Sequence, residues 1–323
     1  MLFFLSLFPI KEQPVELGNV NWIRDYDKAL ASATEADKPV FILFQEVPGC
    51  IICRNYGQDV LSHPLIVEAI EELFVPLAIF NNKGGDDAKI LKKYNEPSWN
   101  NPVVRIIEYN EKAIANRISG NYSQQGIVDA MMSALVSSGR EVPIYLRLLQ
   151  EELLAEKNES EFALSMYCFW SGEKELAAIK GVVATEAGFM DGHEVVKVKF
   201  DEDKTSIKQI YKEAKKANVA DCVYVTDDND KKVFKDAKTY SGYRKDNQTK
   251  YYLYKSPYKA LPLLPIQELK VNRALATRQD PQEYLSPRQI TLFQQLQNNK
   301  SSKSINRIGG DFREAWDDLT SEK

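Results

Sequence analysis

The first part of the chain carries apolar residues at helical spacing on either side of apolar runs of strand length. The run Val40-Phe41-Ile42-Leu43-Phe44 is unbroken, which is typical of a strand buried on both faces. The pattern predicts helices over 26–36, 54–61, 65–73 and 126–136, strands over 40–44, 74–80 and 103–107, and a hairpin turn over 108–112. Because strands that alternate with helices form α/β sheets, we predict a small α/β domain over 18–139, followed by an amphipathic linker helix over 140–160.

The second part of the chain has a different order of elements. The pattern predicts strands over 162–167, 181–189, 194–200 and 222–225, with helices over 168–179 and 207–217. Asp191-Gly192 predicts a tight hairpin, and Ser206 predicts a helix cap. This order is the ferredoxin-like, α+β arrangement, which we place at 161–256. Within it, the charged residues 227–250 are predicted to be a solvated loop and 251–254 a further strand. Residues 257–323 are predicted to be a helical C-terminal extension with a polar tail.

Composition narrows the class of protein. The chain has 323 residues, of which 44% are hydrophobic, and a net charge of −4, so it is globular rather than disordered. Its 46 acidic residues outnumber its 42 basic ones, which argues against a nucleic-acid partner. It contains no run of 18 apolar residues, so no membrane span is predicted. No cofactor is predicted either.

Residues 1–17 form an apolar N-terminal segment, which begins almost entirely with Leu and Phe. The segment lacks a preceding positive charge and a small-residue cleavage site. Two interpretations stay open: a shortened signal peptide, which implies export, or a disordered apolar N-terminus without a targeting role. The second favours the cytoplasm.

The four cysteines, Cys50, Cys53, Cys168 and Cys222, are the most informative scarce residues. They are too few for a disulfide-scaffolded secreted domain. Cys50 and Cys53 follow the buried strand directly and open a helix. Unpaired N–H groups at a helix start stabilise a thiolate, and a second thiol one turn away can close a disulfide. The pair therefore predicts thiol–disulfide exchange.

Two other interpretations of this pair are a zinc site and inert core cysteines. Structural zinc takes four ligands, whereas the chain has no second Cys-x-x-Cys and only two histidines, His63 and His193. Inert cysteines would make their spacing at a helix start a coincidence. No metal is therefore predicted.

Residues 18–139 resemble the thioredoxin superfamily. The segment Val47-Pro48-Gly49-Cys50 is similar to a thioredoxin-like group whose motif is Val-Pro-Gly-Sec-x-x-Thr, with Cys50 at the selenocysteine position and Cys53 at the threonine. The resemblance implies that Pro102 forms the cis-proline loop that lies against the two sulfurs. Ile51-Ile52 stands where thioredoxin has Gly-Pro, and this difference predicts a changed redox potential.

Cys168 lies at a second strand–helix junction and is followed by Phe169 and Trp170. Its thiol again faces a helix N-terminus. Two aromatic side chains beside it form an apolar wall that suits a small apolar group, such as the methyl of a sulfoxide. Glu194 begins a strand next to the hairpin, where a carboxylic acid reaches the same site and can donate a proton to a departing oxygen.

Residues 162–226 resemble methionine sulfoxide reductase of type A through Cys168-Phe169-Trp170 and the segment around Glu194. The resemblance implies that Cys168 attacks the sulfoxide sulfur, that Phe169 and Trp170 hold the methyl group, and that Glu194 protonates the oxygen. Phe189, in the substrate site, replaces a hydrogen-bonding tyrosine. A second thiol, with Cys222 as a candidate, resolves the sulfenic acid, and thioredoxin finally reduces the enzyme.

This second site also has plainer interpretations. Phe169 and Trp170 would be ordinary core aromatics, and Cys222, in an apolar strand, would be a core residue. The family's later Gly-Thr-Gln-Tyr-Arg segment has no counterpart, because Ala220-Asp221-Cys222 stands there. A degenerate domain kept for binding therefore stays open.

Together the two parts predict a thiol redox enzyme in which Cys50 and Cys53 supply electrons to Cys168 during the reduction of methionine sulfoxide in peptides. Its partners would be an oxidised protein or peptide and an external thiol reductant. One alternative is a general thiol–disulfide oxidoreductase whose second domain only binds substrate. Another is a redox-sensing interaction protein that does not turn over.

Overall fold

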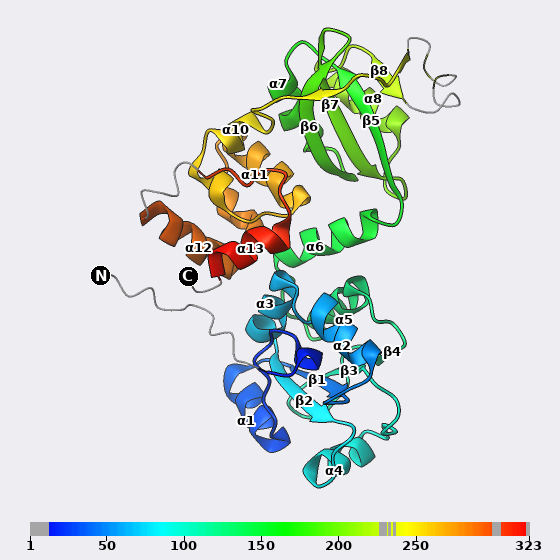
Figure 1. Ribbon diagram of the computed structural model, residues 1–323, viewed down its shortest axis with the longest axis vertical. Coiled ribbons are helices and arrows are strands. Elements are labelled where there is room, and N and C mark those ends of the chain that lie inside the picture. Colours follow the sequence, from blue (N-terminus) through cyan, green and yellow to red (C-terminus); the bar gives the residue numbers. More distant parts are fainter. Residues whose placement is uncertain (1–12, 226–230, 232–233, 235–236, 299–304, 321–323) are drawn as a thin grey trace. The chain divides into compact units, whose positions relative to one another are not determined.

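The computed structural model describes residues 13–225, 231, 234, 237–298 and 305–320. The chain divides into two compact units (Figure 1). The first comprises the residues up to 146 together with those from 316 onward, and the second comprises residues 147–315.

The first unit is built on a four-stranded sheet in the order β2-β1-β3-β4. β1 runs parallel to β2 and antiparallel to β3, and β4 is antiparallel to β3. The elements in chain order are η1 (Val15–Leu17), α1 (Tyr26–Ala36), β1 (Val40–Gln45), α2 (Ile51–Asp59), α3 (Pro64–Leu73), β2 (Val75–Phe80), α4 (Asp86–Lys93), β3 (Val103–Ile107), β4 (Ile118–Ser119) and α5 (Gln124–Ser137).

β1 is the centre of this unit. All six of its residues are buried, as the unbroken apolar run predicts. Val40, Ile42 and Phe44 pack against residues of α1 and α4, and α3 and α5 pack against β2 and β3. The sequence pattern missed α4 because that helix is mostly polar, and Leu91 is its only buried residue.

The second unit contains a six-stranded sheet in the order β10-β6-β7-β5-β8-β9. From β10 to β8 in this order, each strand is antiparallel to the one before it, and β9 runs parallel to β8. α6 (Ile144–Ala155) leads into the unit and α13 (Phe312–Thr320) leads out of it. The other elements are β5 (Glu159–Ser165), α7 (Phe169–Leu176), β6 (Val182–Met190), β7 (His193–Asp201), α8 (Ile207–Lys216), β8 (Val223–Val225), β9 (Lys238–Thr239), β10 (Arg244–Lys245), α10 (Tyr251–Tyr254), η2 (Pro257–Ala260), α11 (Pro265–Thr277), η3 (Pro281–Tyr284) and α12 (Pro287–Asn298).

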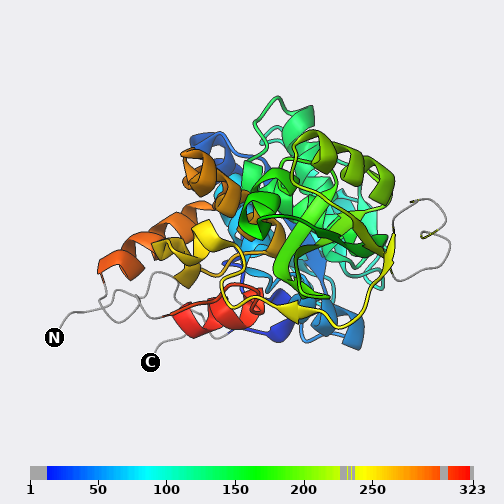
Figure 2. The same cartoon turned by 90° about the horizontal axis from the view of Figure 1, so that it is seen from above.

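The two faces of this sheet carry different groups. Phe162, Leu164 and Val196 pack with residues of α7, α8 and α11 in one apolar cluster. Ala163, Val195 and other residues of the opposite face pack with Cys222, Tyr240 and Tyr243. The helices α10, α11 and α12 gather to one side of the sheet (Figures 1 and 2).

Two local predictions in this unit are confirmed. Asp191 and Gly192 both have positive φ, 51° and 78°, and they connect β6 to β7 as the predicted tight hairpin. The hydroxyl of Ser206 accepts a hydrogen bond from the backbone N–H of Gln209 at the start of α8.

Two other local predictions are wrong, one of them in part. Residues 251–254 form the helix α10 rather than a strand, because Lys250 turns the chain with a left-handed φ of 53° and Tyr251 then stacks on Trp170. The predicted solvated loop over 227–250 is wrong only in part: its described residues before Thr249 are exposed or partly exposed, but the segment contains β9 and β10 and ends in the buried Thr249 and Lys250. Residues 227–230, 232–233 and 235–236 of it lie outside the described residues. Packing overrides propensity at both places.

Glu152 on α6 gives the second unit a predicted pH dependence of stability. One carboxylate oxygen accepts a hydrogen bond of 2.9 Å from the backbone N–H of Ile266 at the start of α11. Burial raises the pKa of Glu152 to about 8. The folded state holds this proton more tightly than the unfolded state does. The contribution of protonated Glu152 to the free energy of unfolding is therefore complete below about pH 4.5 and is lost as the pH rises to about 8.

We therefore expect E152Q to gain about 2 kcal/mol of stability relative to the wild type between pH 5 and pH 8, since Gln accepts the same hydrogen bond without a charge. Urea unfolding of both proteins at the two pH values measures this. Parallel stability profiles for the two proteins would contradict the prediction.

Candidate functional site

The loop between β1 and α2 presents the first pair of thiols. At the end of β1, the buried side chain of Gln45 donates hydrogen bonds to the backbone oxygens of Glu16, at 2.7 Å, and Cys53, at 3.0 Å. The backbone N–H of Gly49 donates to a carboxylate oxygen of Glu16 at 2.9 Å. A Cβ at Gly49 would lie 2.1 Å from the backbone oxygen of Glu46, so only glycine fits directly before Cys50.

The two thiols have unequal access to solvent. Cys50 is the N-cap of α2 and is exposed, whereas Cys53 is fully buried in the first turn. Both are free, and their sulfurs lie 3.5 Å apart. Burial, offset in part by a backbone hydrogen bond with Glu46, raises the pKa of the Cys53 thiol to about 12. Cys50 is therefore the sulfur that an incoming disulfide can reach, and Cys53 holds its proton at neutral pH.

Asn101 and Pro102 complete this site from the start of β3. The Asn101–Pro102 peptide bond is cis, and Pro102 is buried. The Cys53 thiol donates to the side-chain oxygen of Asn101 at 2.8 Å, and the Cys50 sulfur lies 3.9 Å from the same oxygen. Asn101 was not among the predicted site residues, although its position before Pro102 is a signal that points to it.

The surface around Cys50 is apolar. Ile51 and Ile52, inside the Cys-x-x-Cys segment, are 66% and 42% exposed, and Trp99, two residues before Asn101, is 80% exposed. Exposed side chains of this size cost free energy in water, and together they offer an apolar surface to a partner.

The second thiol lies at the start of α7. Cys168 is the N-cap of α7 and is partly exposed. A carboxylate oxygen of Glu194 accepts a hydrogen bond of 2.8 Å from the backbone N–H of Phe169, the residue next to Cys168. The structure therefore brings together two of the predicted residues: Cys168, at the β5–α7 junction, and Glu194, on β7.

The predicted aromatic wall forms a connected cluster with graded burial. The ring of Phe169 lies 5.7 Å from that of Trp170 and 5.4 Å from that of Phe189, both edge to face. Phe169 is only 5% exposed and belongs to the core, whereas Trp170 and Phe189 are partly exposed. Trp170 also stacks on Tyr251 at 3.9 Å, a contact that the sequence did not predict.

Cys222 lies directly before β8. Its backbone N–H donates to the hydroxyl of Ser165 at 3.2 Å, and its sulfur lies 3.0 Å from the same hydroxyl. Its side chain packs with Tyr240 and Tyr243 on the sheet face opposite α7. Its assignment as a resolving thiol stays a prediction.

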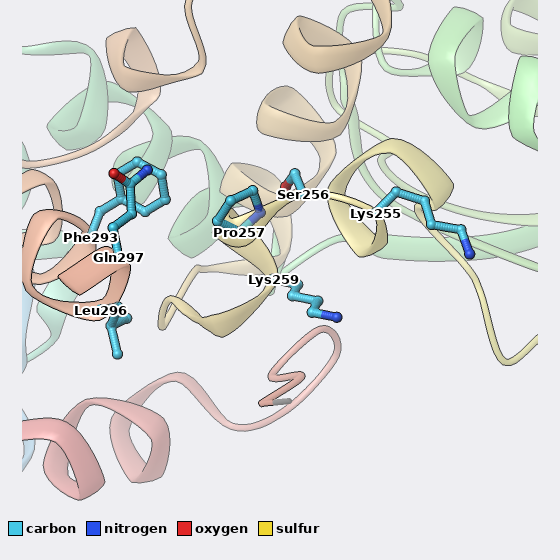
Figure 3. Close-up of a pocket in the computed structure, with 7 residues that line it drawn as sticks. All are labelled: Lys255, Ser256, Pro257, Lys259, Phe293, Leu296 and Gln297. Carbon is cyan, nitrogen blue, oxygen red and sulfur yellow. The ribbon is translucent and has the colours of Figure 1, made fainter. Parts of the chain in front are cut away.

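One cavity of the second unit lies apart from the thiols. A cavity of about 370 Å³ in the second unit is lined by Lys255, Ser256, Pro257, Lys259, Phe293, Leu296 and Gln297 (Figure 3). No thiol lines it, so it is separate from the candidate site. Among the residues that the structure describes, no three His, Cys, Asp or Glu side chains come together as metal ligands, and no helix is long and apolar enough to cross a membrane.

Comparison with known proteins places the fold of the first unit. Residues 21–108 match the model of a thioredoxin-like family, so this part of the chain is a thioredoxin-like domain. A search of curated proteins gives no match.

Similar solved structures cover little more than a third of the chain. They include an oxidoreductase named DsbH (16% identity, 39% of this chain, 91% of that chain, TM-score 0.32). A thioredoxin from Thermus thermophilus (20% identity, 37% and 90%, TM-score 0.33) and a disulphide isomerase from Xylella fastidiosa Temecula1 (21% identity, 35% and 95%, TM-score 0.29) are also similar.

Proposed function

We propose that the protein is a thiol–disulfide oxidoreductase in which Cys50 is the attacking sulfur and Cys53 the resolving one. The observation that carries this proposal is the exposed Cys50 sulfur 3.5 Å from the buried Cys53 sulfur, at the start of a helix in a thioredoxin-like domain. Unpaired N–H groups at a helix start favour the thiolate, which is the reactive form.

The proposed exchange proceeds in two steps that conserve electrons. The Cys50 thiolate attacks one sulfur of a substrate disulfide, which forms a mixed disulfide and releases the other substrate sulfur as a thiolate. Cys53 loses its proton and attacks the Cys50 sulfur, so the Cys50–Cys53 disulfide forms and the second substrate thiolate leaves. Two electrons pass from the protein to the substrate, and an external thiol returns them.

Asn101 and the apolar surface would support these steps. The Asn101 side-chain oxygen, 2.8 Å from the Cys53 sulfur, accepts the thiol hydrogen and holds that sulfur beside Cys50. Ile51 and Trp99 would contact an apolar segment of a protein or peptide substrate.

We further propose that Cys168 in the second unit reduces methionine sulfoxide. Support comes from the carboxylate of Glu194 at the start of α7 and from the partly exposed Trp170 and Phe189 beside it. Cys168 attacks the sulfoxide sulfur, the oxygen passes to the cysteine sulfur, and the products are a thioether and a sulfenic acid. A thiol then condenses with the sulfenic acid to a disulfide and water, and the Cys50–Cys53 dithiol supplies two electrons to restore Cys168.

One observation favours a second candidate function, a general oxidoreductase whose second unit only binds substrate. Phe169, assigned to the substrate methyl group, is 5% exposed and packs in the core, and the Glu194 carboxylate already accepts the N–H of Phe169. Both features suit a folded scaffold that has no turnover of its own.

A sulfoxide assay of three variants distinguishes the two functions. With a methionine sulfoxide peptide and dithiothreitol, we expect C168S to lose all reduction and E194Q to retain about 1% of it, since general acid catalysis contributes about 10²-fold. Cys222→Ser is the third variant: it slows reduction if Cys222 is the resolving thiol and keeps the wild-type rate if dithiothreitol resolves the sulfenic acid. Wild-type protein that leaves the sulfoxide intact, with Cys168 never oxidised in mass spectra, would support the scaffold function.

A further inference from the structure

Three side chains of different chemistry lie in one row across the second sheet. Arg244 on β10 is the register partner of Phe189 on β6, and Phe189 is the partner of Glu194 on β7. Cross-strand partners project from the same face of a sheet. Because Phe189 packs against the apolar cluster that contains residues of α7, the whole row lies on the α7 side.

Contacts join this row to the start of α7. The ring of Phe189 lies 5.4 Å from the ring of Phe169, and Glu194 accepts the backbone N–H of Phe169. Phe169 directly follows Cys168. On the other side of Phe189, the guanidinium carbon of Arg244 lies 4.7 Å from the ring centroid. A cation therefore lies across Phe189 from the Glu194 carboxylate, and Phe189 in turn lies against Phe169, the residue after Cys168.

Arg244 is exposed and has no carboxylate within ion-pair distance among the described residues. Its neighbour Lys245 does have one: it pairs with Glu186 at 2.7 Å, and Lys197 reaches the same carboxylate at 3.1 Å. The ring of Phe189 contacts the guanidinium through a cation–π contact, which uses none of its hydrogen-bond donors, and no described residue accepts a hydrogen bond from it.

We infer that Arg244 binds an anionic group of the substrate of Cys168, so that this site selects substrates with a carboxylate close to the reactive atom. A guanidinium matches a carboxylate with two parallel hydrogen bonds, which fixes orientation as well as charge. For sulfoxide reduction the inference rests on the proposed function. The carboxylate would then be the free α-carboxylate of methionine sulfoxide or an acidic side chain next to it in a peptide.

The inference can be tested without any sulfoxide chemistry. Iodoacetate and iodoacetamide alkylate the same thiol, but only iodoacetate carries a negative charge. The rate with iodoacetate divided by the rate with iodoacetamide at Cys168, read by peptide mass spectrometry, therefore reports the electrostatic potential at this thiol. We expect this ratio to fall about fivefold in R244Q, to be kept in R244K, and to decrease with added salt in the wild type. Lys208→Gln is the matched control, because Lys208 is an exposed cation on α8.

A ratio at Cys168 that R244Q leaves unchanged, or a Cys168 that does not react with iodoacetate, overturns the inference. Cys50, read in the same digest, supplies the reference ratio.

Two substrate pairs then identify the source of the carboxylate. N-acetylmethionine sulfoxide is compared with its methylamide, and a peptide with Asp after the sulfoxide is compared with its Asn counterpart. We expect the acidic member of one pair to be preferred about fivefold, and R244Q to abolish the preference. Equal rates within both pairs overturn the substrate assignment. If no sulfoxide is reduced while the alkylation ratio still depends on Arg244, the proposed reaction fails and the anion site stands.

Discussion

Replacing Cys50 with Ser is expected to lower the rate of insulin disulfide reduction by about 10³-fold or more, with dithiothreitol as the electron source. Cys50 is the exposed sulfur of the pair, and Cys53, fully buried beneath it, cannot take over the attack. A serine hydroxyl is not ionised at neutral pH and is a poor nucleophile toward sulfur. C222S, which removes a partly exposed thiol outside the pair, should keep the wild-type rate.

Replacing Cys53 with Ser should give a different result from the same assay. Attack by Cys50 still occurs, but the mixed disulfide lacks the sulfur that would release it. We therefore expect a covalent adduct between the variant and its substrate to accumulate on non-reducing gels and to disappear on reduction. C50S protein that keeps a tenth of the wild-type rate, or C53S protein that forms no adduct, would contradict the assigned roles.

The parts of this structure that the sequence predicts well depend on neighbours along the chain. The buried strand β1 follows from an unbroken apolar run, and the exposed Cys50 follows from its place between that strand and a helix. The register of β7 against β6 is also local in origin, because the tight hairpin at 191–192 sets it, whereas the approach of Glu194 to α7 also needs the pairing of β5 with β7.

The parts that the sequence does not predict depend on residues far apart. Asn101 contacts Cys53 across 48 positions, and although its place before Pro102 points to the loop beside the sulfurs, the sequence does not show that its side chain accepts the Cys53 thiol. Arg244 belongs to a two-residue strand whose place beside Phe189 is set by the whole sheet. Lys250 lies in a charged stretch that composition assigns to solvent, although it is 5% exposed in the structure. A charge can be buried only where partners from other elements meet it, and a single sequence does not list those partners.

Lys250 lies at the centre of a buried ionic network in the second unit. Its ammonium group lies 3.1 Å from a carboxylate oxygen of Glu268 on α11 and donates to the backbone oxygen of Thr185 at 2.8 Å. Its backbone N–H donates to Glu173 on α7 at 2.6 Å. Glu268 in turn accepts the backbone N–H of Gly309 at 2.6 Å. The network therefore joins α7, β6, α11 and the segment before α13.

The balance of charge in this network makes the lysine essential to it. Burial alone would lower the pKa of Lys250, but the carboxylates of Glu268 and Glu173 outweigh burial and raise it. Burial raises the pKa of Glu173, and Lys250 offsets part of that effect. Without the ammonium group, the buried Glu268 carboxylate would lose its ion pair and the buried Glu173 would lose a nearby cation.

We therefore expect K250M to lower the free energy of unfolding of the second unit by about 3–5 kcal/mol, as measured by urea unfolding at pH 7. The exposed Lys208→Met on α8 is the matched control and should change stability by less than about 0.5 kcal/mol. If K250M alone does not fold, K250M combined with E268Q should recover part of the lost stability. The second change removes the buried carboxylate that K250M leaves without its ion-pair partner. A loss below about 1 kcal/mol for K250M would show that water reaches these carboxylates, and the network would then contribute little to holding α11 and the residues around Gly309 against α7.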